Sequence, residues 1–527
     1  MSEQRSPVSL SRRRFLAAAT VGGTLAAFGV PAARADERTL GVGEAQYQAL
    51  AERGYNRRFQ ARPAKIYVPT TTEEVRGAVA RAVAEDARIA VRSGGHCFDD
   101  FVDNAQTRSI IDLGRLGAVF WDEHHRAFSV DAGADIGTVY TALHRWGVTV
   151  PGGICLGVGM GGHVSGGGYG PLSRRFGLVA DHLAGVEVVT VDADRTAKVV
   201  VATKDGPDRD LWWAHTGGGG GNFGVVTRFL LRSPGSDGSD PALALPKPPH
   251  SMLSARLILP ITTEDSFVRL LGNYLGFFER HSAPGNEFAG LYAPLMIRTT
   301  GTGAAEMLIL FDAETPDARA RFDEFVDTVS DGVFPPPILT PVTGLSYPDT
   351  VNQVYYAKGA NTTRVKVKAA YLRTAYSPEQ LRIFYRYITD LRFLGESQLE
   401  FLPFGGAINA VAADATAMPA RDSFMKMLIH ASWRLPFDDD RYVRWAREMY
   451  RDVHAGTGGV PVPNEAYGGS YINYPDPDLA DAEWNRSGLP WHAFYYGDNY
   501  QRLLRVKAAA DPGNVFQHRL SIGRPDW

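Results

Sequence analysis

A histidine and a cysteine stand in glycine-rich runs of this chain that could face a ligand. His96 closes Ser93-Gly94-Gly95-His96, directly after an expected strand at 89–91, and Cys155 lies in the run 151–170. Glycine lets the backbone approach a ligand closely. A lone histidine or cysteine is more often an ordinary hydrogen-bonding or buried residue. Their occurrence in two such runs therefore indicates a ligand site.

Glycine is abundant, with 56 residues, and it clusters at 93–95, 152–170 and 217–224. The middle run contains a G-x-G-x-x-G pattern that starts at Gly157. More glycines follow the pattern, so we expect no helix to open there, as the dinucleotide fingerprint requires. We expect instead loops whose backbone N–H groups grip an extended ligand. Turns alone would explain any single run, whereas three runs in one domain favour a long cofactor.

The cysteine count limits the chemistry further. Cys97 and Cys155 are the only cysteines, which excludes a disulfide scaffold and an all-cysteine metal or iron–sulfur site. No metal site is expected. A disulfide between Cys97 and Cys155 is an alternative for an exported protein.

The first 35 residues have the pattern of an export signal. Twin arginines within 11–16 precede a mildly apolar stretch, and Ala33-Arg34-Ala35 supplies a small-residue cleavage site. Glycines within the stretch disfavour a stable membrane anchor. We therefore expect a secreted protein that uses twin-arginine export, a route suited to proteins that take up a cofactor before they leave the cytoplasm.

Length, charge and hydrophobic pattern predict a mixed α+β protein of more than one domain. At ~150 residues per domain, a chain of 527 residues corresponds to two to four domains. The net charge of −3, without a basic run, argues against a nucleic-acid partner. Irregular alternation of strands and helices argues against a doubly wound sheet, and 233–249 has the composition of a linker to a second unit.

The second unit has apolar strands interleaved with helices, which predicts an antiparallel sheet covered by helices. In the first unit, Thr71 and Glu74 form a capping box that opens a helix. The other expected helices are 136–146, 263–281, 316–329 and 378–394, and the expected strands are 89–91, 109–113, 127–130, 186–191, 198–202, 307–311 and 399–404.

Five motifs together resemble one protein family. They are SGGHC at 93–97, PGGIC-x-x-V-G-x-G-G-H-x-x-G-G-G-x-G at 151–170, GGGGGNFGVVT at 217–227, YINYPD at 471–476 and RLLRVKAAADPGNVF at 502–516. The chain is similar to the berberine bridge enzyme-like branch of the FAD-linked oxidases, flavoproteins of the vanillyl-alcohol oxidase/p-cresol methylhydroxylase (PCMH) type. Within that branch it looks most similar to the oxidases that act on aclacinomycin, tirandamycin and glycopeptide hexoses.

The resemblance implies a two-domain α+β fold after the signal peptide of residues 1–35. Residues 36–235 would form an FAD-binding domain of the PCMH type, and residues 236–475 a substrate-binding domain with an antiparallel sheet covered by helices. Residues 476–527 would be a C-terminal segment that completes the FAD domain.

The resemblance also implies FAD held by two covalent bonds. His96 would bond to the flavin 8α-methyl group and Cys155 to flavin C6, which is incompatible with the disulfide and leaves Cys97 a packing role. The other residues implied to bind FAD are Arg92, Ser93, Gly94, Gly95, Val158, Gly159, Gly161, Gly162, His163, Gly166, Gly167, Gly168, Tyr169, Gly221, Asn222, Gly224, Val225 and Asn473.

The catalytic base implied by the resemblance is Tyr474. Alcohol oxidation by a flavin needs a base that takes the hydroxyl proton while hydride leaves the carbon. A phenol with a pKa near 10 performs this role only if its anion is stabilised locally. Strand-like alternation would place Tyr474 opposite Asn473, and a buried strand tyrosine with a hydrogen-bonded hydroxyl is the structural alternative.

Two further positions bear on mechanism through the resemblance. Val158 stands where oxygen access to the flavin is governed, and its small side chain predicts oxygen as electron acceptor and hydrogen peroxide as product. Phe404 stands where some relatives carry a second catalytic tyrosine, which puts a two-tyrosine mechanism in doubt. Glu400 could substitute for that group, or it is a solvated or ion-paired strand residue.

The leading interpretation is an oxidase that converts a secondary alcohol of an antibiotic-type natural product, including an alcohol on a sugar, to a ketone. The alternatives are an oligosaccharide oxidase that forms lactones and a non-catalytic flavin-containing binding protein. The pattern indicates no particular substrate or oligomeric state. Aromatic residues suited to stacking on a sugar or polyketide are Tyr292, Tyr355, Tyr356, Trp433 and Tyr467.

Overall fold

The computed structural model describes residues 38–260, 263–299, 305–359, 363–393 and 397–523. From Glu37 onward the chain forms one compact unit. The predicted signal peptide lies outside the described residues. Within the described ranges, no helix is both long and apolar enough to cross a membrane.

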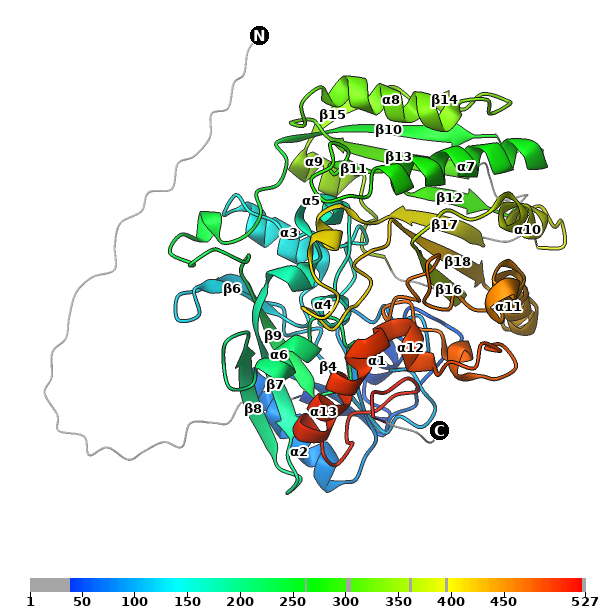
Figure 1. Ribbon diagram of the computed structural model, residues 1–527. Helices are drawn as coiled ribbons and strands as arrows, with labels where there is room; N and C mark the ends of the chain where they lie inside the picture. Colours follow the sequence, from blue (N-terminus) through cyan, green and yellow to red (C-terminus); the bar gives the residue numbers. More distant parts are fainter. Residues whose placement is uncertain (1–37, 261–262, 300–304, 360–362, 394–396, 524–527) are drawn as a thin grey trace, which may run out of the picture. The chain divides into compact units, whose positions relative to one another are not determined.

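Two sheets come from the N-terminal part of the compact unit, drawn blue to green in Figure 1. In the first sheet β4 is parallel to both of its neighbours, and the second sheet is antiparallel. The first has the order β1 (Arg38–Gly41), β2 (Lys65–Val68), β4 (Ser109–Asp112), β3 (Ile89–Arg92). The second has the order β5 (Val119–Asp122), β6 (Ala127–Asp131), β9 (Val225–Leu231), β7 (Leu183–Val191), β8 (Ala197–Thr203).

Helix α2 (Thr72–Ala84) contacts both of these sheets. It opens as predicted, because the Thr71 side chain accepts a hydrogen bond from the Glu74 N–H at 3.2 Å. The Glu74 carboxylate bonds to Thr70 and not back to Thr71, so only half of the capping box forms. The apolar side chains along α2 are buried, so this helix contributes to the hydrophobic core between the two sheets.

The third sheet has nine strands and is antiparallel throughout. Its main path is β14 (Ile338–Leu339), β10 (Ser251–Leu259), β13 (Ala305–Asp312), β12 (Leu295–Arg298), β17 (Gln398–Pro403), β18 (Met425–Trp433), β16 (Arg364–Leu372), with β11 (Leu291–Tyr292) on β13 and β15 (Thr343–Ser346) on β10. The helices on its outer face are α7 (Glu264–Arg280), α8 (Ala318–Ser330), α10 (Pro378–Ile388) and α11 (Asp439–Val453) (Figure 1). The predicted fold class is therefore confirmed, while the domain boundaries remain predictions.

Helix α10 ends at Ile388, before the predicted 394. The Asp390 carboxylate accepts a hydrogen bond from the Arg392 N–H there and forms a turn.

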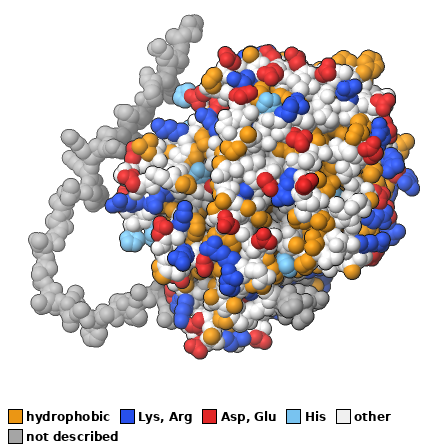
Figure 2. Space-filling model, in the orientation of Figure 1, with side chains coloured by type: hydrophobic (Ala, Val, Ile, Leu, Met, Phe, Trp, Pro, Cys, Tyr) orange, Lys and Arg blue, Asp and Glu red, His pale blue; other side chains and the backbone are white. Residues whose placement is uncertain are grey.

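The remaining helices are short and lie in the connections between these elements. They are α1 (Tyr47–Ala51), α3 (Ile136–His144), α4 (Met160–Ser165), α5 (Ser173–Phe176), α6 (Arg209–Ala214), α9 (Tyr347–Gln353), α12 (Trp491–Tyr496) and α13 (Tyr500–Ala510). Acidic and basic side chains are interspersed over the face shown in Figure 2.

The edge strand β16 is clasped by the chain segment 474–478. On the inner face of β16, Val367 and Ala369 pack against Tyr474. Strand alternation turns the neighbouring lysines to the outer face, where Lys368 Nζ lies 5.1 Å from the ring centroid of Tyr450 in α11. The segment therefore reaches both faces of the sheet edge.

On the outer face, two aspartates of the segment bind the two lysines of β16. Lys366 Nζ lies 2.7 Å from Asp476 Oδ1, and Lys368 Nζ lies 2.6 Å from Asp478 Oδ2. All four side chains are at most 5% exposed. Burial acts to raise the Asp478 pKa, but Lys366, Lys368 and Arg447 outweigh it and hold the pKa well below its usual value. The Asp478 carboxylate of the clasp therefore stays ionised at neutral pH.

We expect Asp476→Asn to reduce the free energy of unfolding by about 3 kcal/mol, because it leaves two buried ammonium groups with one carboxylate. The loss should appear at neutral pH. In the wild type, the depressed pKa of Asp478 stabilises the fold at pH values above the ordinary pKa of an aspartate. This stabilisation is lost as the pH falls through the Asp478 pKa of the folded state. Denaturant unfolding measures the loss in the variant and the pH dependence of the wild type.

The matched control is Asp323→Asn, which breaks the exposed pair between Arg319 and Asp323 and should change stability by less than about 1 kcal/mol. Equal stability of the two variants would contradict a structural role for the clasp.

Candidate functional site

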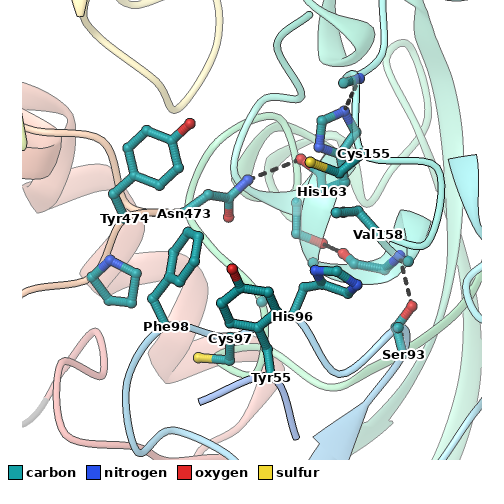
Figure 3. A pocket seen from close by; sticks show the side chains of 18 of the residues that line it. Tyr55, Ser93, His96, Cys97, Phe98, Cys155, Val158, His163, Asn473 and Tyr474 are labelled. Carbon is teal, nitrogen blue, oxygen red and sulfur yellow. Dashed lines mark hydrogen bonds between the residues drawn. The ribbon is translucent and has the colours of Figure 1, made fainter. Parts of the chain in front are cut away.

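A cavity of about 670 Å³ lies between the N-terminal loops and the inner face of the nine-stranded sheet. That volume is typical of small-molecule and cofactor sites. Both predicted covalent attachment residues, His96 and Cys155, line it, and so does the predicted base Tyr474 (Figure 3). The structure therefore brings together three residues that the sequence places far apart.

The His96 loop is held by its neighbours. Arg92, at the end of β3, is fully buried and its Nε lies 2.8 Å from Asp112 Oδ2. Ser93 Oγ donates to the Ala132 carbonyl at 2.5 Å. The Tyr55 ring stacks on the imidazole with ring centroids 5.2 Å apart. Burial and then the nearby Arg53 lower the His96 pKa, which favours the neutral, nucleophilic imidazole.

The Cys155 loop is held by a segment that belongs to the other wall of the cavity. The Leu156 N–H donates to the Tyr356 carbonyl at 3.0 Å, and the Tyr356 N–H donates to the Ile154 carbonyl at 3.1 Å. Burial, followed by the charge of Glu400, raises the Cys155 pKa to about 12. Both cysteines are free thiols, so the Cys97–Cys155 disulfide alternative is not what the structure contains.

The two loops pack backbone against backbone. A Cβ on Gly94 would clash with the backbone of Gly159, and the converse also holds. The Gly161 N–H donates to Ser93 Oγ at 3.3 Å. Glycine is required at this contact because it lacks the Cβ that would separate the loops.

The prediction that no helix opens in the middle glycine run is wrong. Helix α4 begins at Met160 with Gly159 as its N-cap. A single helical turn is tolerated because the backbone hydrogen bonds of α4 compensate the low helix propensity of its two glycines. The fingerprint interpretation still fails, since the element directly before the pattern is helix α3 and not a strand.

The cavity wall fits a long ligand with polar edges, such as FAD. A Cβ on Gly162 would meet no atom within 4 Å, and a Cβ on Gly220 none nearer than 3.9 Å, so these glycines leave open space beside the wall. His518 is buried, and its Nε2 has no hydrogen-bond partner. The residues that would hold the cofactor are therefore the two glycine loops, the 217–224 run and the C-terminal segment near His518.

Not every residue implied to bind FAD lines the cavity. Gly166, Gly167, Gly168 and Val225 stand behind the wall, while the other implied residues line it. Gly166 leaves room for Asn473, whose Nδ2 donates to the His163 carbonyl at 3.1 Å. Lining residues that the sequence analysis missed include Tyr55, His215, Lys426, His430 and His518.

Tyr474 lies in a turn and not in the expected strand. Its N–H donates to the Tyr471 carbonyl at 2.8 Å, because the chain bends here to pass round the edge of β16. Burial, followed by the charge of Glu400, raises the Tyr474 pKa well above 10. An anion-stabilising group is therefore needed if the phenol is to act as a base.

Lys426 supplies a candidate for that group. It is 1% exposed, and its Nζ has no hydrogen-bond partner. The Nζ lies 3.3 Å from the ring centroid of Tyr169 and 5.4 Å from that of Tyr474. Burial lowers the Lys426 pKa well below its usual value. The ammonium form of a buried lysine surrounded by aromatic rings is stabilised most by a neighbouring anion.

The inner face of the sheet carries a polar row formed by Gln398, Glu400 and His430. Glu400 lines the cavity, its side chain is 13% exposed, and its Oε1 lies 3.1 Å from His430 Nδ1, which accords with the alternative of a paired strand residue. Phe404 is fully buried against Tyr169 and does not line the cavity. Of the aromatic residues proposed for stacking, Tyr292 and Tyr356 line the cavity, whereas Tyr355, Trp433 and Tyr467 do not. The alternation of polar and apolar residues over 398–402 is the sequence signal that could have revealed Gln398 and Glu400 of this row.

Two family models match the chain, an FAD binding domain over residues 63–196 and a berberine and berberine-like model over residues 470–523. The aclacinomycin-N/aclacinomycin-A oxidase of Streptomyces galilaeus is 44% identical over 541 residues, which cover 98% of this chain and 98% of the relative. A crystal structure of a flavoenzyme involved in caerulomycin biosynthesis has a TM-score of 0.90 and 45% identity, covering 93% of this chain and 99% of that one.

A crystal structure of a glycopeptide hexose oxidase complexed with teicoplanin has a TM-score of 0.89 and 42% identity, with the same coverage. These likenesses extend over nearly all of the chain. They confirm the predicted family and FAD as its cofactor. The chain belongs to the berberine bridge enzyme-like family of FAD-linked oxidases, and it is an FAD-dependent oxidoreductase.

Proposed function

We propose that this protein oxidises an alcohol of an antibiotic-type natural product, a secondary alcohol to a ketone, including an alcohol on a sugar. The observation that carries the proposal is the cavity in which Tyr474 and Lys426 share one space with His96 and Cys155. The named activities of the aclacinomycin and glycopeptide hexose oxidases support the substrate class. A lactone-forming sugar oxidase is the second candidate, because the hexose oxidase acts in the same fold.

When bound, FAD would supply the acceptor for the hydride, and with oxygen as the final acceptor the two electrons and two protons would yield hydrogen peroxide. The chain's own residues handle the proton. Tyr474 takes it from the substrate hydroxyl through its phenolate oxygen. The ammonium form of Lys426 favours that phenolate against burial and the charge of Glu400, both of which favour the neutral phenol.

His96 and Cys155 are the proposed attachment points for FAD, through the 8α-methyl group and C6. A neutral imidazole and a thiol on one cavity are the nucleophiles that such bonds require. The twin-arginine pattern of residues 11–16 supports export of the folded, cofactor-loaded protein. Covalent attachment would prevent loss of the cofactor after export.

We expect the acid-denatured wild type to carry the mass and the visible absorbance of FAD. His96→Ala and Cys155→Ala should each keep FAD through the remaining bond, and the double variant should release it. Mass spectrometry and absorbance spectroscopy measure the retained FAD.

The control is Cys97→Ala, since the Cys97 sulfur points away from Cys155 (Figure 3). This variant should retain FAD as the wild type does. Complete release of FAD from the acid-denatured wild type would disprove both covalent bonds.

Tyr474→Phe should lower kcat by about 100-fold or more, because general-base catalysis contributes a factor of that size. Lys426→Met should shift the rise of the pH–rate profile to higher pH, because the proposed Tyr474 phenolate would then have no ammonium group beside it. Steady-state kinetics over a pH series on an alcohol substrate measures both effects.

Tyr442→Phe is the matched control, because Tyr442 stacks on Trp433 away from the cavity. It should turn over as the wild type does. An unchanged kcat in Tyr474→Phe would exclude the proposed base, whereas a wild type that turns over no alcohol would favour a protein that binds its ligand without catalysis.

Val158→Leu should slow turnover with oxygen and leave turnover with an artificial electron acceptor unchanged. Val158 lines the cavity beside His96 and Cys155 (Figure 3), so the added methylene and longer reach of leucine there would restrict access of a small molecule. Oxygen consumption and dye reduction measure the two rates. Equal slowing of both, or of neither, would show that Val158 does not govern oxygen access.

A further inference from the structure

Glu400 is the one carboxylate among the described residues that line the cavity. It projects from the inner face of β17, where alternation also places Gln398 and Leu402. Its side chain is 13% exposed. A carboxylate in so sheltered a place requires hydrogen-bond donors, because burial of an unpaired charge is costly.

Only one oxygen of Glu400 has such donors. Gln398 Nε2 donates to Oε1 at 2.7 Å, and His430 Nδ1 lies 3.1 Å from the same oxygen. Glu400 Oε2 has no hydrogen-bond partner among the described residues. The two neighbours therefore orient the carboxylate and leave its second oxygen unused.

The tautomer of His430 supports this arrangement. His430 Nε2 is buried and has no hydrogen-bond partner. A proton on Nε2 would be a stranded donor, whereas a proton on Nδ1 is donated to Glu400. Gln398 and His430 therefore both occupy Oε1, and Oε2 stays available to a ligand.

Glu400 lies beside the proposed base. It is paired across β17 and β18 with Leu428, and Tyr474 packs against the cluster formed by Leu428, Val367 and Ala369. After burial, the charge of Glu400 is what raises the pKa of Tyr474. The carboxylate therefore stands close to the place where the proposed base meets the substrate. A donor bound to Oε2 would be near the carbon that is oxidised.

We propose that Glu400 is a specificity-determining residue that accepts a hydrogen bond from a second hydroxyl group of the substrate, beside the one that is oxidised. This inference rests on the proposed function and names its substrate class: a sugar ring, or a comparably hydroxylated ring, and not an isolated alcohol. Tyr292 and Tyr356, which line the same cavity, supply the apolar faces on which such a ring stacks.

The test compares parent and deoxy substrates on three proteins. The probes are methyl glycosides of glucose, galactose and mannose, each with its monodeoxy analogues, and cyclohexanol as an isolated alcohol. The proteins are the FAD-loaded wild type, Glu400→Gln and Glu306→Gln. Glu306 is the matched control because it lies on the same sheet face, outside the cavity, paired with Arg256. Calorimetry measures binding, and peroxide release measures kcat and KM.

In the wild type we expect removal of one particular hydroxyl to lower binding and kcat/KM by about 10- to 100-fold, as for a hydrogen bond to a charged group. Glu400→Gln should lower binding and kcat/KM for the parent glycoside by the same factor, mainly through a higher KM. On that deoxy analogue it should differ little from the wild type. Glu306→Gln should behave as the wild type does.

Two results would overturn the inference. One is that the two losses are independent, so that Glu400→Gln weakens binding of the parent glycoside and of every deoxy analogue by the same factor. The other is a wild type that binds none of the glycosides or that uses cyclohexanol equally well. If other alcohols are then turned over and Tyr474→Phe slows that turnover, the proposed function stands without this inference. If Tyr474→Phe leaves turnover unchanged, the proposed function itself is wrong.

Discussion

Contact between two glycine backbones is the constraint on which the candidate site depends. Gly94 and Gly159 approach so closely that neither position has room for a Cβ. This contact joins the loop of His96 to the loop of Cys155 and makes one wall of two distant segments (Figure 3). Any larger side chain would separate the two nucleophiles, so the packing of the loops precedes any chemistry with the cofactor.

The opposite wall depends on a strand edge and on buried charge. The inner face of the nine-stranded sheet supplies Glu400 and Lys426, and the clasp on β16 fixes Tyr474 beside them. An edge strand leaves backbone groups unpaired, and on β16 the Asn56 side chain and the backbone of Gly468 and Gly469 bond to them. The ion pairs of the clasp then hold the segment that carries the proposed base beside this edge.

Water exclusion gives the site its electrostatic character. Burial raises the pKa of Tyr474 and lowers that of Lys426, so each group alone prefers its neutral form. After burial, Glu400 raises the pKa of the phenol further, and in the proposed mechanism the ammonium form of Lys426 would oppose it. The balance between them, and not the phenol alone, would then set how readily Tyr474 takes a proton.

The sequence by itself determined the local features, because they depend on near neighbours along the chain. Helix α2, the alternation of β17 and the glycine-rich loops around His96 and Cys155 were all predictable from spacing, and the motifs indicated the family and FAD. The turn at Tyr474 and the helix α4 were missed, since local propensity gave way to tertiary packing. Only the tertiary structure decided which charges meet. Lys426 lies over the tyrosines, and Glu400 lies between two orienting neighbours, because strand pairing joins residues that the sequence separates.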